Sequence, residues 1–341
     1  MSPEISVLLP VYNGCAYLEQ QIETLLGQSF ADLEVVAYDD GSSDGSLAIL
    51  ERLAAKDCRL RVHRGDVNLG QNAALRWLLA NSTGRLVAFS DQDDIWHRDK
   101  LARLRAAIDG VALAYGRSLL VDAQGRELGR SLTDVVSSTL DGRDDARILL
   151  WNSVSGHAML VEREIIDPGV FLFQRPYDWL IASVATFSKG IKFVPDAITY
   201  HRLHGGNQVN AWMLTGRREA AQRRRGWRHG LSLMLDSLLV LRGSAALPAE
   251  KRRIFAAMTD MVSREANRIL PSPASFTFRR RFMGLVGQLT TSEEVHANMV
   301  TKLRQLRPLP AWAYEWLRAK TGGGVAGIRI PTDDNRDGST R

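Results

Sequence analysis

Apolar strands and amphipathic helices alternate along the first ninety residues of the chain. Residues 5–11, ISVLLPV, are almost wholly apolar, which is typical of a strand buried on both faces of a parallel sheet. Apolar positions at helical spacing follow in residues 17–26. The alternation then predicts strands over residues 33–40, 59–63 and 86–90, and helices over residues 46–56 and 71–80. Short connections indicate an open α/β sheet, in which ligands bind beyond the carboxyl ends of the strands.

The pattern becomes mixed between residues 112 and 200. It predicts a hairpin over 121–128, a helix running into a strand over 148–161, a helix over 177–187 and a strand over 192–203. From residue 210 the segments are helical and basic, and the last twenty or so residues have the composition of a linker. We therefore predict an α/β domain over residues 1–209, a basic helical region over residues 210–320 and a disordered tail over residues 321–341.

The composition, 45% hydrophobic and 24% charged, is that of a folded protein. Cys15 and Cys58 are the only cysteines, which excludes a disulfide framework and a zinc spacing and favours a reducing compartment. The N-terminus has no basic leader, and no apolar run reaches the roughly 18 residues of a membrane-spanning helix. We therefore expect a cytoplasmic protein.

Charge is distributed unevenly along the chain. Residues 1–209 hold 21 Lys and Arg against 27 Asp and Glu, whereas residues 210–341 hold 23 against 11. Arginines beside leucine-rich helices suit an anionic membrane surface, and a helical cap with solvated charges is the alternative. We expect no nucleic-acid partner, because no recognised binding module accompanies the charge.

Polar residues follow the first two predicted strands. Pro10, Tyr12 and Asn13 come after the first, and the run from Asp39 to Asp44 comes after the second. An aromatic ring and a carboxylate at one crevice could bind a pyrimidine, which has a π-face and a single imino N–H. The alternative is a turn that caps the following helix.

A second polar cluster, Ser90-Asp91-Gln92-Asp93-Asp94, follows the strand at 86–90. Side chains two apart in an extended backbone point the same way, so Asp91 and Asp93 can converge on a hard divalent cation. A solvated acidic turn is the alternative.

Two further candidates lie downstream. Asp178, between Tyr177 and Trp179, opens a predicted helix, where partial burial would raise the pKa of the carboxyl toward that of a general base; a helix cap is the alternative. Arg202 and His204 share one face of an extended segment and suit a diphosphate, or a metal ligand beside a phosphate donor. A basic loop after an edge strand explains them equally well.

Other catalytic motifs find less support. Residues 41–45 fit G-x-S-x-G between a strand and a helix, which would make Ser43 a hydrolase nucleophile with His204 as its base. Only one predicted strand precedes the one that leads into this match, and the hypothesis leaves the acidic cluster unused. The sequence has neither a dinucleotide-binding fingerprint nor a P-loop.

Together these segments resemble the family 2 inverting glycosyltransferases of the GT-A fold. The resemblance covers roughly residues 4–209 and is carried by ISVLLPVYNG, VAYDDGSSDGS, NLGQNAALR, GRLVAFSDQDDIW, PYDW and HRLHGGN. FSDQDDIW with YDW and HRLH is similar to the bacterial rhamnosyltransferase-like branch that builds O-antigen and capsule polysaccharides. The resemblance implies a Rossmann-like mixed sheet flanked by helices, with a C-terminal helical extension.

The resemblance also implies roles for single residues. Asp39 would contact the pyrimidine and Asp91 the ribose or sugar, while Asp93 and His204 would hold Mn²⁺ or Mg²⁺. Asp178 would deprotonate the acceptor hydroxyl. The remaining implied contacts are to the nucleotide from Pro10, Tyr12, Asn13 and Gln92, and to the diphosphate from Arg202 and His204.

The implied reaction transfers rhamnose or another hexose from a dTDP- or UDP-sugar to a glycan or polyprenyl-linked acceptor. It would take place on the inner face of the cytoplasmic membrane. Tyr177 and His201 depart from residues frequent in relatives at positions that bear on acceptor geometry. Gly226 interrupts a Q-x-x-R-W motif of processive synthases and no membrane-spanning helix is predicted, so we expect one sugar per encounter. A catalytically inactive scaffold with the same fold is the alternative.

Overall fold

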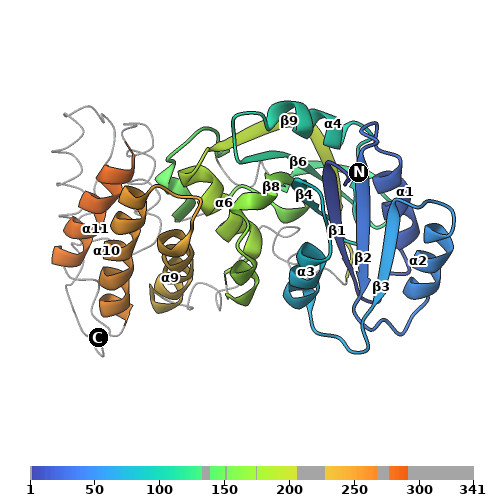
Figure 1. Cartoon of the computed structure of the whole chain (residues 1–341), viewed down its shortest axis with the longest axis horizontal. Coiled ribbons are helices and arrows are strands. Elements are labelled where there is room, and N and C mark those ends of the chain that lie inside the picture. Colours follow the sequence, from blue (N-terminus) through green and yellow to red (C-terminus); the bar gives the residue numbers. More distant parts are fainter. Residues whose placement is uncertain are drawn as a thin grey trace, which may run out of the picture. The chain divides into compact units, whose positions relative to one another are not determined.

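A nine-stranded mixed sheet organises the chain (Figure 1). The computed structural model describes residues 2–132, 139–149, 152–173, 175–205, 227–266 and 276–290. The strands are β1 (Ile5–Val11), β2 (Leu33–Asp39), β3 (Leu60–Arg64), β4 (Leu86–Phe89), β5 (Ile95–Trp96), β6 (Leu113–Val121), β7 (Glu127–Ser131), β8 (Met159–Glu162) and β9 (Ile191–Arg202). Their order is β3-β2-β1-β4-β8-β6-β9-β5, and β7 pairs with β6.

The first four strands of this order are parallel. β1 lies between β2 and β4, with Val11 opposite Asp39 and Leu8 opposite Phe89. All residues of β2 and β4 are buried. Burial on both faces explains the continuous apolar runs in the sequence. The predicted α/β sheet and its first four strands are confirmed.

Strand direction reverses at β8, again at β6 and again at β5. β8 is antiparallel to β4, β6 is antiparallel to β8, and β9 is parallel to β6. β9 therefore runs in the same direction as β4. Consequently the end of β9 and the beginning of β8 lie at the same edge as the carboxyl ends of β1, β2 and β4, which we call the carboxyl edge.

Helices cover both faces of the sheet. On one face, α1 (Leu18–Leu26), α2 (Ser46–Ala54) and α4 (Lys100–Ala107) pack against alternate residues of β1, including Val7 and Leu9. α3 (Gln71–Ala80) and α6 (Tyr177–Phe187) lie on the other face, where Phe89 of β4 contacts the Tyr177 ring. The sheet is thus a buried layer whose edge carries the polar loops.

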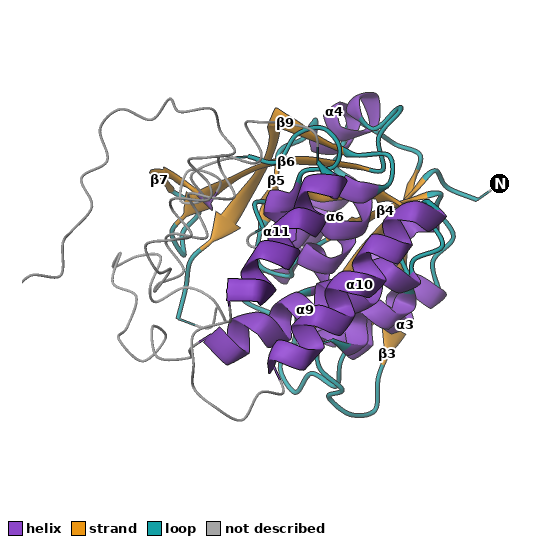
Figure 2. Cartoon of the chain, turned by 90° about the vertical axis from the view of Figure 1, so that its left-hand side faces the viewer, coloured by secondary structure: helices purple, strands orange, loops and turns teal. Residues whose placement is uncertain are grey.

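Three C-terminal helices lie side by side (Figure 2). α10 (Ala249–Ala266) packs between α9 (Trp227–Gly243) and α11 (Phe276–Leu289), and α9 also contacts α6. No helix in the described part of the chain has the length and apolarity needed to cross a membrane. Residues 206–226, 267–275 and 291–341, which include the predicted tail, lie outside the described residues, so the domain boundaries stay predictions.

The segment before β8 differs from the prediction. Instead of an α-helix, its described residues form two 3₁₀ turns, Ala146–Leu149 and Gly156–Ala158. The Asn152 side chain closes a turn by accepting from the Val154 N–H and donating to the Val154 carbonyl. Asparagine competes in this way with helical backbone hydrogen bonds, which periodicity alone does not reveal.

Gly116→Ala is expected to destabilise the sheet. Gly116 lies where the register of β6 against β9 shifts, and an added Cβ would fall 1.7 Å from the Ala197 carbonyl oxygen. The strands must separate locally, at a cost of about 1–3 kcal/mol or more. Urea unfolding should show a lower midpoint, whereas Gly243→Ala, whose Cβ meets nothing within 4 Å, should not lower it. An unchanged midpoint in Gly116→Ala would contradict this register.

Candidate functional site

Hydrogen bonds join the loops that follow β1, β2 and β4. The Gln92 side chain accepts from the Tyr12 N–H at 2.8 Å and donates to the Tyr12 carbonyl at 3.0 Å. Asn13 donates its N–H to Ser42 Oγ and accepts from the Ser43 N–H, both at 2.9 Å. Three of the residues predicted to bind a nucleotide therefore lie together, and the Tyr12 ring is 46% exposed.

Asp39 ends β2 at the same place. Its Oδ2 accepts from the Ser42 N–H at 3.3 Å, whereas Oδ1 is buried and has no hydrogen-bond partner among the described residues. A buried acceptor without a donor is costly, so this oxygen suits a donor group of a ligand. Pro10 of β1 is half-buried and lies opposite Tyr38 of β2, the residue before Asp39. Asp40 instead holds the loop after β3 through the N–H groups of Leu69 and Gly70.

Asp93 and His204 come together from positions 111 residues apart. Asp93 Oδ2 lies 2.8 Å from His204 Nε2, and the two side chains are 16% and 20% exposed. Burial raises the pKa of Asp93, and the nearby carboxylates of Asp91 and Asp94 raise it further. A divalent cation would relieve this repulsion, so the pair fits the predicted metal ligands.

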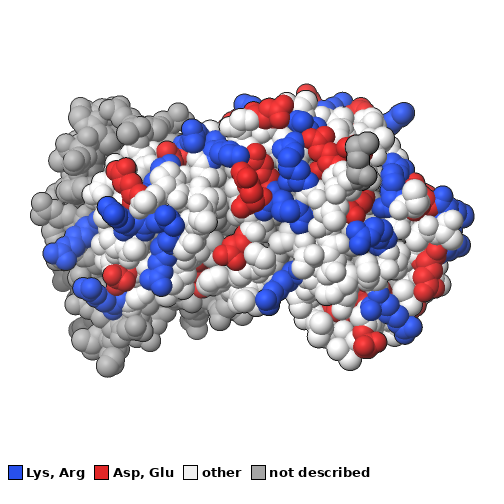
Figure 3. Space-filling model, viewed as in Figure 1, with Lys and Arg blue, Asp and Glu red and all other residues white. Residues whose placement is uncertain are grey.

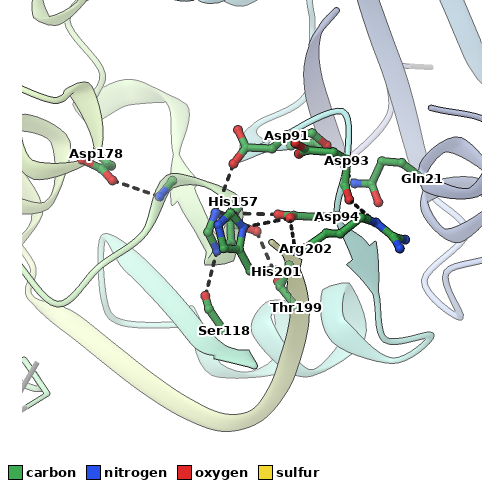
Figure 4. A network of polar contacts seen from close by, with 12 residues as sticks. Gln21, Asp91, Asp93, Asp94, Ser118, His157, Asp178, Thr199, His201 and Arg202 are labelled. Carbon is green, nitrogen blue, oxygen red and sulfur yellow. Dashed lines mark hydrogen bonds and ion pairs between the residues drawn. The ribbon is translucent and has the colours of Figure 1, made fainter. Parts of the chain in front are cut away.

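Asp94 forms the buried centre of a second group (Figure 4). Its Oδ1 lies 2.9 Å from His201 Nδ1 and accepts from the Arg202 N–H at 3.2 Å. Burial alone would raise the pKa of Asp94, but the His201 and His157 rings hold it below its usual range. One potential ligand atom from each of Asp91, Asp94, His157 and His201 lies within 4.8 Å of the others.

Arg202 is buried and faces protein groups. Its guanidinium donates to the carbonyls of Asp93 and Ala123, both at 2.9 Å, and to Gln20 Oε1 at 2.7 Å. It also lies over the Tyr17 ring, 4.6 Å from the ring centre. These contacts fix the backbone of the loop after β4, and a diphosphate contact of Arg202 stays a prediction.

Asp178 lies inside the first turn of α6. Pro176 is the N-cap, so the simple capping alternative does not describe Asp178. Its Oδ2 accepts from the Gly156 N–H at 3.1 Å, and Oδ1 accepts from the Trp179 N–H at 2.6 Å. Burial raises the pKa of Asp178 to about 6, in the range useful for a general base near neutral pH.

Comparison with known proteins finds similarity to one family over part of the chain. Residues 6–167, just under half of the chain, match the family described as Glycosyl transferase family 2. An uncharacterised glycosyltransferase of Nostoc is 28% identical over 236 residues, which are 64% of this chain and 70% of that protein. The chain is a glycosyltransferase, and its residues 6–167 are similar to family 2.

Two further similarities bear on this glycosyltransferase. A Campylobacter jejuni protein named GalNAc(5)-diNAcBac-PP-undecaprenol beta-1,3-glucosyltransferase is 31% identical over 120 residues, 35% of this chain and 39% of that protein. The structure of Staphylococcus aureus TarS in complex with UDP aligns with 94% of this chain and 88% of its own, with a TM-score of 0.55 and 20% identity. The second similarity supports the GT-A fold.

The geometry gives no support to the hydrolase alternative. Ser43 Oγ lies 3.4 Å from Asn13 Oδ1, while His204 contacts Asp93.

Three further buried residues of the site, His157, Ser118 and Lys100, were not predicted from the sequence. No motif marks them, because they are brought together by contacts between segments that lie far apart in the chain.

Asp94→Asn is expected to lower the free energy of unfolding by about 3–5 kcal/mol, because it leaves the buried His201 ring without its charged partner. The double variant Asp94→Asn/His201→Gln should recover part of this loss, since neither charge then remains. Asp99→Asn, which removes an exposed pair with Arg103 at 3.6 Å, should cost less than about 1 kcal/mol. Urea unfolding at pH 7 measures all three; equal midpoints for Asp94→Asn and Asp99→Asn would refute the pairing.

Proposed function

We propose that this glycosyltransferase is an inverting, divalent-cation-dependent enzyme that takes its sugar from a pyrimidine nucleotide diphosphate. The observation that carries the proposal is that two consecutive residues, Gly156 and His157, hold Asp178 and Asp91 at the carboxyl edge. Asp91 contacts His157, and Asp178 contacts the adjacent Gly156, although the two carboxylates are 87 positions apart in the sequence. A base and a donor-binding carboxylate held by one turn suit a single displacement.

The nucleotide would lie against the loops after β1 and β2. The exposed Tyr12 ring offers a stacking surface, and the unpaired Oδ1 of Asp39 offers an acceptor for the imino N–H of uracil or thymine. Guanine also has an N–H donor at its base edge, but it is larger and presents an additional amino group. We therefore favour UDP- or dTDP-sugars as donors.

The metal would be held by Asp93 and His204. The other carboxylate and imidazole group, around Asp94, is a weaker candidate because Asp94 is fully buried and already bonded to His201. Asp93 and His204 remain partly exposed, so a ligand phosphate can reach the same ion. Bound there, Mn²⁺ or Mg²⁺ would stabilise the charge on the departing diphosphate.

Asp178 would accept the proton of the acceptor hydroxyl as that oxygen attacks the anomeric carbon. The oxygen forms the new glycosidic bond while the bond to the diphosphate breaks, and one displacement inverts the configuration. The N–H groups of Gly156 and Trp179 orient the carboxylate and stabilise its charged form.

The acceptor class is inferred from a relative and from charge. The name of the Campylobacter relative includes an undecaprenol-linked acceptor. We propose a glycan or polyprenyl-linked acceptor of cell-surface polysaccharide synthesis, and rhamnose or another hexose as the sugar. On the face shown in Figure 3, basic side chains lie over the C-terminal helices with acidic ones between them. Peripheral binding to the inner membrane surface fits this distribution but depends also on arginines 217–225, which lie outside the described residues.

Wild-type protein with Mn²⁺ and UDP or dTDP should melt at a higher temperature than protein alone. At ligand concentrations 100-fold above Kd the stabilisation is about 2.7 kcal/mol. Asp93→Ala should lose this shift, whereas Asp109→Ala, at a side chain 75% exposed, should keep it. A larger shift with GDP, or an equal shift without metal, would contradict the proposed donor site.

The transfer rate should depend on the ionisation of Asp178. Because the base acts in its ionised form, kcat/KM should be constant above pH about 7 and fall toward tenfold per pH unit below about 6. Asp178→Asn should reduce kcat by at least about 100-fold while nucleotide binding persists. Initial rates between pH 5 and 8 with saturating metal test both points, and a flat profile or an active Asp178→Asn protein would exclude this base.

A further inference from the structure

Two consecutive residues, Gly156 and His157, contact both sides of the proposed active site. The Gly156 N–H donates to Asp178 Oδ2 at 3.1 Å, and His157 Nδ1 lies 3.2 Å from Asp91 Oδ2 (Figure 4). They belong to the 3₁₀ turn that enters β8, the strand that runs against β4. This turn therefore links the acceptor-side carboxylate to the donor-side carboxylate.

The partners of His157 determine where its proton lies. An ionised carboxylate only accepts hydrogen bonds, so the contact with Asp91 requires a proton on Nδ1. Nε2 lies 2.8 Å from Ser118 Oγ, and a hydroxyl can either donate to a neutral ring or accept from a charged one. In both cases Nδ1–H faces Asp91 Oδ2 at 3.2 Å, which is nearer than Asp94 Oδ2 at 3.7 Å.

The His157 side chain is held rigidly. Its ring stacks on His201, with centroids 4.7 Å apart and planes 4° from parallel. Its carbonyl accepts from Lys100 Nζ at 2.5 Å and from Thr199 Oγ1 at 3.3 Å. The residue is 6% exposed, so neither ring rotation nor water readily replaces the contact with Asp91.

Position 156, directly before His157, requires glycine. A Cβ on Gly156 would lie 2.2 Å from the Tyr177 hydroxyl oxygen, and Tyr177 directly precedes Asp178. Only a residue without a side chain lets this backbone approach the first turn of α6 so closely. The turn at Gly156 therefore packs directly against helix α6, which carries the proposed base.

We propose that His157 is a positioning residue: it directs the Asp91 carboxylate toward the sugar nucleotide, and its turn keeps that carboxylate in register with Asp178. This inference rests on the proposed function of the two carboxylates. Asp91 is 30% exposed in its side chain, so without an oriented donor its carboxylate could rotate toward solvent. A fixed carboxylate loses less conformational entropy when the nucleotide binds.

Two substitutions separate orientation from packing. In His157→Asn the amide nitrogen stands near the position of Nδ1 and can still donate to Asp91, whereas in His157→Gln it stands near Nε2 and faces Ser118. We expect His157→Gln to raise the Kd for UDP or dTDP with Mn²⁺ at least tenfold, which is about 1.4 kcal/mol. His157→Asn should stay within about threefold of wild type. The KM for the donor should follow the Kd, and the KM for the acceptor should not change.

His63→Gln is the matched control. His63 packs on Trp77 in β3, and the same substitution there should leave nucleotide binding unchanged. Equal binding by wild type, His157→Asn and His157→Gln would overturn the inference, and so would equal losses of binding and melting temperature in both His157 variants. A wild-type protein that binds no nucleotide diphosphate would instead overturn the proposed function itself.

A measurement on the wild-type protein covers the case in which His157→Gln does not fold. In protein with ¹⁵N-labelled histidine, the His157 ring is the one whose resonances shift most in Asp91→Asn. We expect its Nδ1 to carry a proton at neutral pH. A neutral ring protonated only on Nε2 could not donate to Asp91 and would overturn the inference.

Discussion

The carboxylate of Asp94 ties together two loops on which the site depends. It accepts hydrogen bonds from His201 Nδ1 and the Arg202 N–H, and Arg202 in turn donates to the Asp93 carbonyl. The loop after β4 is thus attached to the end of β9, more than a hundred residues later. A fully buried carboxylate is tolerated only when it is paired and hydrogen-bonded, so the two loops cannot separate without leaving a charge unpaired.

Around this buried pair, the groups proposed for chemistry keep some exposure. Asp91, Asp93 and His204 are partly open to solvent, and their geometry is set by neighbours that are not. This division suits an active site, because ligands need access while the atoms they meet need fixed positions. The carboxylates of Asp91 and Asp94 repel that of Asp93, and the nearby His204 and His201 offset this repulsion only in part.

The segment that carries Asp178 is supported from outside the region that matches the family. Arg175, three residues earlier, donates to the carbonyls of Leu149 and Leu233, and its guanidinium stacks on Trp179 at 3.5 Å. The Arg175 N–H also donates to Asp236 of α9 at 3.0 Å. The first C-terminal helix, α9, therefore holds the segment that carries the proposed base.

The sequence by itself determined the parallel half of the sheet, because strands buried on both faces must be continuous apolar runs, such as residues 5–11 and 33–39. It also indicated Asp39, Asp91, Asp93 and Asp178, since these follow strands or open a helix. The place of His157, between Asp91 and Ser118, was decided only by the tertiary structure. Its position follows from β8 running antiparallel to β4, which brings the beginning of one strand to the end of another. Local residue spacing carries no information on such pairing, since it is set by how distant segments bury their faces together.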